Sequence, residues 1–153
     1  MIPTFNRRQT LAIGAGAVAA LTWLRGSDGA AATESDTAEL IKKFTGGKTA
    51  TEGRVRIDMP EIAENGNTVP MTVMVESPMT EQSHVTEVLV LADGNPRPGV
   101  ATFHFSPASG AAEANTRIRL AQTQNVTAIA KMNDGSFFSS SKQVKVTIGG
   151  CGG

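Results

Sequence analysis

Cysteine is almost absent from this chain of 153 residues, which contains a single one, Cys151. An intramolecular disulfide needs a second cysteine, so a disulfide-stapled fold is excluded. The cysteine lies between two pairs of glycines in the closing string VTIGGCGG, residues 146–153. A cysteine that serves packing belongs in a core, so this position points to a use of the thiol itself.

Long apolar runs are also missing from the sequence. The longest, from Leu11 to Leu24, is shorter than the ~20 residues that a membrane-spanning helix needs. It is followed by an A-x-A pattern at residues 30–32, which is typical of a cleavage site. We therefore interpret residues 1–32 as an export signal and expect no membrane anchor after its removal.

The export route is indicated by a pair of arginines directly ahead of the apolar run. Arg7 and Arg8 favour the twin-arginine route, which carries folded proteins across the bacterial inner membrane. An ordinary Sec signal with two chance arginines is the alternative. Both routes predict a periplasmic mature protein that begins at Thr33.

The mature chain has no strong charge of either sign. Of 14 basic and 14 acidic residues, removal of residues 1–32 takes away three arginines and Asp28, which leaves 11 and 13 and a formal charge of −2. No basic patch is present in the sequence for nucleic acid or anionic lipid. Neither is therefore expected as a partner.

A short helix is predicted at the start of the mature chain. Residues 34–46 begin with acidic and hydroxyl side chains, carry apolar residues at helical spacing and stop at Gly46 and Gly47. From Gly53 onward the period changes to two, which is typical of strands with one buried face. Strands with inward apolar residues are predicted at 54–59, 69–77, 100–106, 116–121 and 143–148, and two more at Val85–Leu91 and Val126–Met132.

Seven short strands separated by Gly, Pro and Asn turns indicate the fold class. The pattern predicts a mainly β protein, an immunoglobulin-like antiparallel β-sandwich with a short N-terminal helix, over residues 33–148. The Cys-Trp-Cys pin of true immunoglobulin domains is missing, so the likeness is one of architecture. In the adjacent pair Phe137 and Phe138, we expect one ring inside and the other exposed or covered by a partner.

The last five residues are predicted to form a flexible arm, 149–153. Glycine lacks a Cβ, so Gly149, Gly150, Gly152 and Gly153 are expected to supply flexibility and a width that fits a narrow slot. Fully extended, the arm reaches at most ~17 Å, at ~3.3–3.6 Å per residue. Its thiolate can hold a sulfur group through an S–S bond.

No group in the sequence near Cys151 activates its sulfur. No His, Lys or Arg lies within five residues of it, so we expect partner active sites to supply the activating groups. The stretches AENGNTVP, residues 63–70, and SPMT, residues 77–80, hold no nucleophile with a base, no acid pair and no metal-ligand spacing. The chain is therefore predicted to be non-catalytic, with no catalytic residue, metal or cofactor.

Two other interpretations of these residues stay open. An unpaired cysteine in an exported protein commonly makes an intermolecular disulfide, so the tail can be a simple linker. The second is a periplasmic copper-binding protein, since thioether and imidazole ligands suit copper. Against copper, methionine more often fills cores. Its candidate ligands are His84, His104, Met59, Met71, Met74, Met79 and Met132.

The mature sequence resembles SoxY, a subunit of the SoxYZ sulfur-carrier complex of bacterial thiosulfate oxidation. The strings that carry the resemblance are TGG, PEIAENGNTVPMTVMVESPMT, NPRPGVATFHFSP, TRIRLAQTQNVTAIAKMNDG and above all VTIGGCGG. The resemblance implies that Cys151 is the covalent attachment site for sulfur intermediates derived from thiosulfate. It also implies a SoxZ-like β-sandwich as heterodimer partner, carried out by folded co-export.

The resemblance further implies which enzymes load and unload the thiol. A SoxAX-like c-type cytochrome couples thiosulfate to it oxidatively, and a SoxB-like metallohydrolase removes the terminal sulfone as sulfate. Where a SoxCD-like sulfur dehydrogenase exists, it oxidises the remaining sulfur, which the SoxB-like enzyme then releases. The carrier thiol returns unchanged.

Overall fold

The computed structural model describes residues 34–150. The predicted export signal, residues 1–32, lies outside this range. Helix α2, Glu34–Thr45, confirms the predicted helix and carries Lys42 and Lys43 in its last turn, where cations complement the helix dipole. Nine strands follow: β1 (Thr51–Glu52), β2 (Val55–Asp58), β3 (Ile62–Asn65), β4 (Val69–Val75), β5 (Val85–Ala92), β6 (Gly99–His104), β7 (Ala112–Ile118), β8 (Gln124–Met132) and β9 (Phe137–Ile148).

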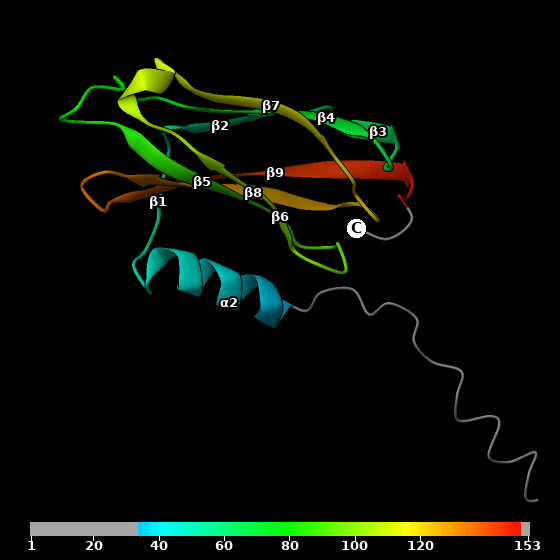
Figure 1. Cartoon of the computed structure of the whole chain (residues 1–153). Helices are drawn as coiled ribbons and strands as arrows, with labels where there is room; N and C mark the ends of the chain where they lie inside the picture. The colour runs from blue at the N-terminus through cyan, green and yellow to red at the C-terminus, as the bar shows by residue number, and fades with distance from the viewer. Residues whose placement is uncertain (1–33, 151–153) are drawn as a thin grey trace, which may run out of the picture. The chain divides into compact units, whose positions relative to one another are not determined.

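The strands form two sheets that pack face to face (Figure 1). The larger sheet has the order β1-β9-β8-β5-β6, with β3 also pairing with β9, and the smaller sheet has the order β2-β4-β7. Strands β1 and β3 run parallel to β9, whereas the remaining pairs are antiparallel. The predicted fold class, a mainly β sandwich with one short helix, is confirmed.

The main core lies between the two sheets. Strand β4 alternates buried and more exposed residues, as the period of two predicts, and its buried side chains face the larger sheet. The centre of β5 is buried on both faces, which explains its nearly continuous apolar sequence. The inter-sheet core includes Val69, Met71, Val73, Val88, Val90, Leu120, Val126 and Val144.

Helix α2 covers the outer face of the larger sheet as a third layer (Figure 1). Phe137 is buried there, and its ring meets the ring of Phe44 edge to face, with centroids 5.9 Å apart. Phe138 points to the other side of β9, packs on the inter-sheet core and lies 4.6 Å from the guanidinium of Arg54. The two rings lie on opposite faces of β9, but the expectation that one is exposed or covered by a partner is wrong, because the chain's own helix covers Phe137 and Phe138 packs on the core. In residues 34–150, no helix has the length and apolarity to cross a membrane.

The predicted strands differ from the observed ones in three places. Strands β1 and β3 were not predicted, because a strand of two residues and one with mostly exposed side chains leave no alternating pattern. The strand predicted at 116–121 is instead β7, Ala112–Ile118, whose first half carries few apolar residues. Strand β9 begins six residues earlier than predicted, over a serine-rich stretch.

Ile148, at the end of the strand predicted at 143–148, is not buried in the core as predicted. Along one face of β9, Val144 is fully buried, Val146 is half-buried and Ile148 is 65% exposed. The strand therefore runs past the covered core before it ends. This overhang decides where the carboxyl end of the chain leaves the sandwich.

A tight turn joins β8 to β9 at Asp134. Its carboxylate accepts hydrogen bonds from the hydroxyl of Ser136, at 2.6 Å, and from the backbone N–H of Ser136, at 2.8 Å. These bonds favour the charged form and hold the pKa of Asp134 below its ordinary value. Gly135 takes a positive φ of 78°, which few other residues adopt without strain.

Candidate functional site

The predicted arm begins where β9 ends at Ile148. Of its five residues, the structure describes Gly149 and Gly150. The predicted attachment residue Cys151 lies outside the described residues, as do Gly152 and Gly153. The site is therefore described through the segment that holds the chain directly before the cysteine.

Three backbone segments meet at this point, and we call them together the arm root: Gly66, Leu120 and residues 148–150. The N–H of Gly66 donates to the carbonyl of Ile148 at 2.7 Å, and the N–H of Leu120 donates to the carbonyl of Gly66 at 2.8 Å. The N–H of Gly150 then donates to the carbonyl of Leu120 at 2.9 Å, and Gly150 is buried. The arm root thus fixes the residue next to Cys151.

The glycines of the arm root are required by this close approach of backbones. A Cβ on Gly66 would lie 2.7 Å from the amide nitrogen of Gly150 and still closer to the carbonyl oxygen of Leu120. A Cβ on Gly150 would lie 2.7 Å from the carbonyl oxygen of Gly66, and one on Gly149 would overlap the carbonyl oxygen of Ala121. Only glycine fits at the three positions without a shift of the backbone.

This finding adds a second role for two arm residues. Gly149 and Gly150 lie in close backbone packing, and Gly150 also donates a hydrogen bond. Their missing Cβ allows this contact. The flexibility expected of Gly149, Gly150, Gly152 and Gly153 stays a prediction. The sequence pattern treated the glycines between strands as turn residues and missed the part that Gly66 plays, because its partners lie far away in the sequence.

A buried asparagine supports the arm root from the other side of the segment 119–121. The side-chain amide of Asn95, which is 3% exposed, donates to the carbonyl of Arg119 at 2.8 Å. Its oxygen accepts from the N–H of Ala121 and from the side-chain amide of Gln124, both at 2.9 Å. The segment is therefore bonded along both edges, which fixes the carbonyl of Leu120 toward Gly150.

Four of the five candidate methionine ligands of copper pack inside the sandwich, and Met59 and Met71 line one hollow. Met59, Met71, Met79 and Met132 are buried members of the inter-sheet core. Met74 points to the opposite face of β4 from Met71, as alternation along a strand requires. His84 Nδ1 lies 2.9 Å from the carbonyl of Thr80, whereas His104 is exposed near Glu87. In the described part of the chain, no group of three or more His, Cys, Asp or Glu could hold a metal ion.

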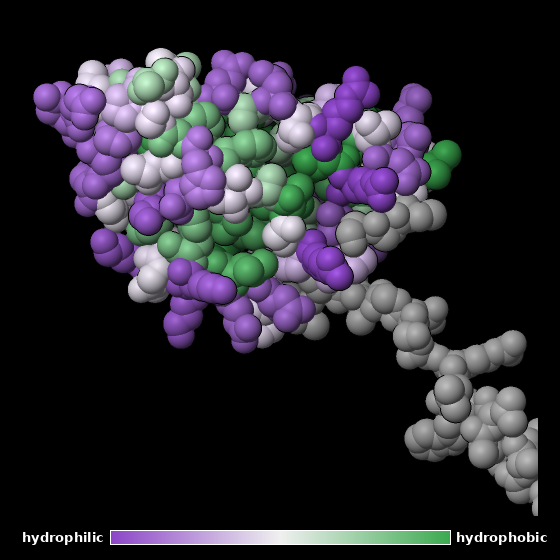
Figure 2. All heavy atoms as spheres, in the orientation of Figure 1, coloured by the Kyte–Doolittle hydropathy of each residue, from purple (hydrophilic) through white to green (hydrophobic). Residues whose placement is uncertain are grey.

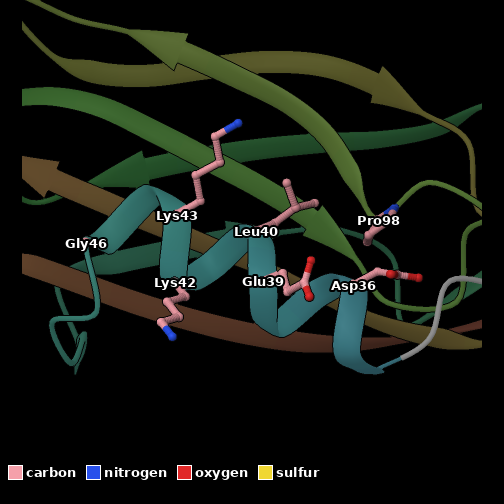
Figure 3. Close-up of a pocket in the computed structure, with 7 residues that line it drawn as sticks. All are labelled: Asp36, Glu39, Leu40, Lys42, Lys43, Gly46 and Pro98. Atoms are coloured by element: carbon pink, nitrogen blue, oxygen red, sulfur yellow. The ribbon is translucent and has the colours of Figure 1, made fainter.

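A hollow of about 780 Å³ lies along α2 and is open to solvent (Figure 3). Asp36, Glu39, Lys42 and Lys43 project around it from the helix, and Pro98 closes one side. Its charges are of both signs, and it shares no residue with the arm root. We assign it no part in sulfur chemistry.

Comparisons of the whole chain with known proteins point to one family. The family described as sulfur oxidation protein SoxY matches residues 41–151, more than half of the chain. Among solved structures, the sulfur carrier protein SoxY from Chlorobium limicola f thiosulfatophilum is 31% identical, with a TM-score of 0.64. That match covers 76% of this chain and 100% of the other. No curated protein matches the chain significantly.

A more distant likeness concerns the fold alone. Superoxide reductase (neelaredoxin) from Ignicoccus hospitalis is 17% identical, with a TM-score of 0.55, and the match covers 61% of this chain and 80% of the other. At this identity the likeness shows a shared sandwich and no shared chemistry. The SoxY match, in contrast, continues through the arm root to Cys151. The chain belongs to the SoxY family of sulfur oxidation proteins.

Proposed function

We propose that this protein is a non-catalytic sulfur carrier that holds thiosulfate-derived intermediates on the thiol of Cys151. The observation that carries the proposal is the family match that extends to residue 151, where the chain has its single cysteine. The solved SoxY with which the chain shares 31% identity is itself a sulfur carrier protein. The buried Gly150 supports the proposal, because it anchors the residue directly before the thiol at the rim of the sandwich.

Loading of the carrier is an oxidation. The Cys151 thiol and the outer sulfur of thiosulfate form an S–S bond, one proton is released, and two electrons pass to a SoxAX-like c-type cytochrome. The product is a cysteine S-thiosulfonate with one negative charge. Formation requires the thiolate, and the base that generates it is supplied by the cytochrome's active site.

Unloading alternates hydrolysis and oxidation. A SoxB-like metallohydrolase adds water across the bond to the terminal sulfone, which releases sulfate and two protons and leaves a persulfide. A SoxCD-like dehydrogenase, where present, takes six electrons from the persulfide and adds three oxygens from water. A second hydrolysis then releases sulfate and restores the thiol. The carrier contributes the S–S linkage and a position, not the catalytic groups.

A carrier of this kind has to meet several enzymes in turn. We propose a SoxZ-like subunit as its permanent partner, and residues 149–153 as the segment that presents Cys151 to the enzymes. Strands β3 and β9 each leave one large apolar side chain uncovered for a partner, Ile62 at 59% and Ile148 at 65% exposed, on opposite faces of the sheet. Both strands lead into the arm root, so a partner there would sit beside the site that carries sulfur.

Export to the periplasm is part of the same proposal. It is supported by Arg7 and Arg8 ahead of the apolar run and by the A-x-A pattern at residues 30–32. We expect the mature protein to begin at Thr33. Replacement of both arginines by lysine should leave the precursor in the cytoplasm, and fractionation with N-terminal sequencing measures this. Normal export of the lysine variant would contradict the twin-arginine route.

The carrier proposal is tested by Cys151→Ser in a system reconstituted with the oxidising cytochrome and the hydrolase. Thiosulfate-dependent electron transfer should be lost, while the circular dichroism spectrum and binding to the partner subunit are retained. Intact mass of the unaltered chain should rise by the mass of a thiosulfonate group after incubation with thiosulfate and the cytochrome. Thr147→Ala, an exposed position close to the arm root, is the matched control and should turn over normally. Turnover retained by Cys151→Ser would overturn the proposal.

A further inference from the structure

A groove of about 360 Å³ lies between β6 and β7. These are edge strands of the two sheets, because within residues 34–150 β6 pairs with β5 alone and β7 with β4 alone. Three arginines line the groove: Arg97 from the loop before β6, Arg117 from the end of β7, and Arg119 two residues further on. On the face seen in Figure 2, strongly hydrophilic side chains border an apolar strip at the end of the sandwich where β9 terminates.

The three guanidinium groups form no salt bridge with a carboxylate of residues 34–150. The ion pair found within that range joins His104 to Glu87. The side chains of all three arginines are exposed. Arginine stays charged at every physiological pH and offers paired N–H donors that match the oxygens of a tetrahedral anion. Three such groups around one groove form a positive site in a mature chain whose formal charge is −2.

The groove has a fixed wall. Asn95 lines it and is the same buried side chain that bonds the backbones of Arg119 and Ala121. Residues 117 and 119 are two apart in an extended segment, so their side chains project from the same face. The backbone of Arg119 is therefore held in place, so little backbone freedom is lost when its side chain binds an anion.

The groove and the arm root lie on opposite edges of one extended segment. Leu120 directs its N–H and carbonyl to Gly66 and Gly150, whereas the groups flanking it are directed to Asn95. Gly150 and the Asn95 side chain each lie within hydrogen-bonding distance of this segment, so only its width separates them. An S-thiosulfonate on the next residue extends roughly 5–6 Å from its Cα, since its S–S bonds are about 2.05 Å each. The long arginine side chains can cover the remaining distance.

We propose that this arginine groove binds the sulfonate end of the adduct that Cys151 carries. The inference rests on the proposed carrier function and adds to it a docking place for the anionic cargo on the carrier's own body. A docked sulfonate shields the S–S bond from stray thiols between encounters with the enzymes. Arg97, Arg117 and Arg119 are positioning residues, and the reacting sulfur stays on Cys151.

Tetrathionate tests the groove in the purified full chain without any partner enzyme. The Cys151 thiolate attacks a central sulfur of tetrathionate, an S–S bond breaks, and thiosulfate leaves with the electron pair. The product is the same S-thiosulfonate, and no external oxidant is consumed. A neutral disulfide, dithiodipyridine, reports thiol reactivity without an anion. The ratio of the two rate constants therefore cancels any change in the thiolate fraction.

Arg97→Gln and Arg119→Gln should each lower the ratio of the tetrathionate to the dithiodipyridine rate constant severalfold. The triple variant, which adds Arg117→Gln, should lower it by about tenfold or more at low salt. The ratio in the unaltered chain should fall as salt is raised, whereas the triple variant should respond weakly. Arg56→Gln is the matched control, because Arg56 is exposed on β2 at the opposite edge of the smaller sheet. Its ratio should stay unchanged.

An unchanged ratio in the triple variant would overturn the proposal. If that variant also bound the partner subunit more weakly, the groove would belong to a protein interface instead. Failure of the carrier function appears separately, as turnover that persists in Cys151→Ser. The two ideas can therefore fail independently.

Discussion

Gly66→Ala gives the sharpest test of the arm root. The added Cβ would lie 2.7 Å from the nitrogen of Gly150 and closer still to the oxygen of Leu120. Gly66 is not among the residues with positive φ, so alanine meets no backbone penalty and the cost is one of contact. To relieve the contact, the turn has to move away from Leu120, and the hydrogen bonds of 2.7 and 2.8 Å that Gly66 makes are strained or lost.

The magnitude follows from these two effects. Overpacking a close contact costs ~1–3 kcal/mol, and each lost backbone hydrogen bond costs ~1 kcal/mol. The free energy of unfolding should therefore fall by about 2–5 kcal/mol, and Tm by about 8–20 °C, at ~4 °C per kcal/mol. Because domains have ~5–15 kcal/mol of stability, the variant should still fold at room temperature.

The assay combines thermal unfolding with amide hydrogen exchange. In Gly66→Ala, exchange at the Gly150 amide should accelerate by more than tenfold, because its bond to Leu120 depends on the same contact. Gly99→Ala is the matched control, since its Cβ would lie 3.6 Å from Leu40 Cδ1, an ordinary contact. It should be neutral or slightly stabilising. A Tm for Gly66→Ala within 2 °C of the control would refute the close packing of the three segments.

Three further predictions concern other parts of the structure. Asn95→Ala removes three hydrogen bonds and takes one partner from the buried Gln124. The free energy of unfolding, measured by chemical denaturation, should therefore fall by about 2–4 kcal/mol. Ser136→Ala should raise the pKa of Asp134 toward its ordinary value in an NMR titration. The pKa of Asp134 is depressed in the folded state. Its carboxylate therefore stabilises the fold above its unfolded pKa, and this effect is lost as pH falls through its folded pKa. An unchanged pKa in Ser136→Ala would contradict the role given to the Ser136 hydroxyl. Phe137→Ala should lower the free energy of unfolding by about 3–5 kcal/mol and make helix α2 susceptible to proteolysis. If the helix stays protected from protease, it docks without this ring.

The sequence by itself determined the local elements. The apolar spacing between Glu34 and Thr45 specifies a helix, and the alternation in β2 and β4 specifies strands with one buried face, because these periods depend only on neighbouring residues. The lone cysteine among glycines also stood out without any structure. These features, with the resemblance they support, were sufficient to predict the sandwich and the SoxY family.

Only the tertiary structure decided how distant segments meet. Alternation shows that a strand has a buried face but not which strand lies beside it, so the parallel pairing of β3 with β9 was not predicted. A glycine needed for close approach looks in sequence like any turn or tail glycine. The roles of Gly66 and Gly150 depend on the carbonyls of other segments, which the chain brings within hydrogen-bonding distance only when it folds. The arginine groove likewise exists because two sheet edges come together at Arg97 and Arg119.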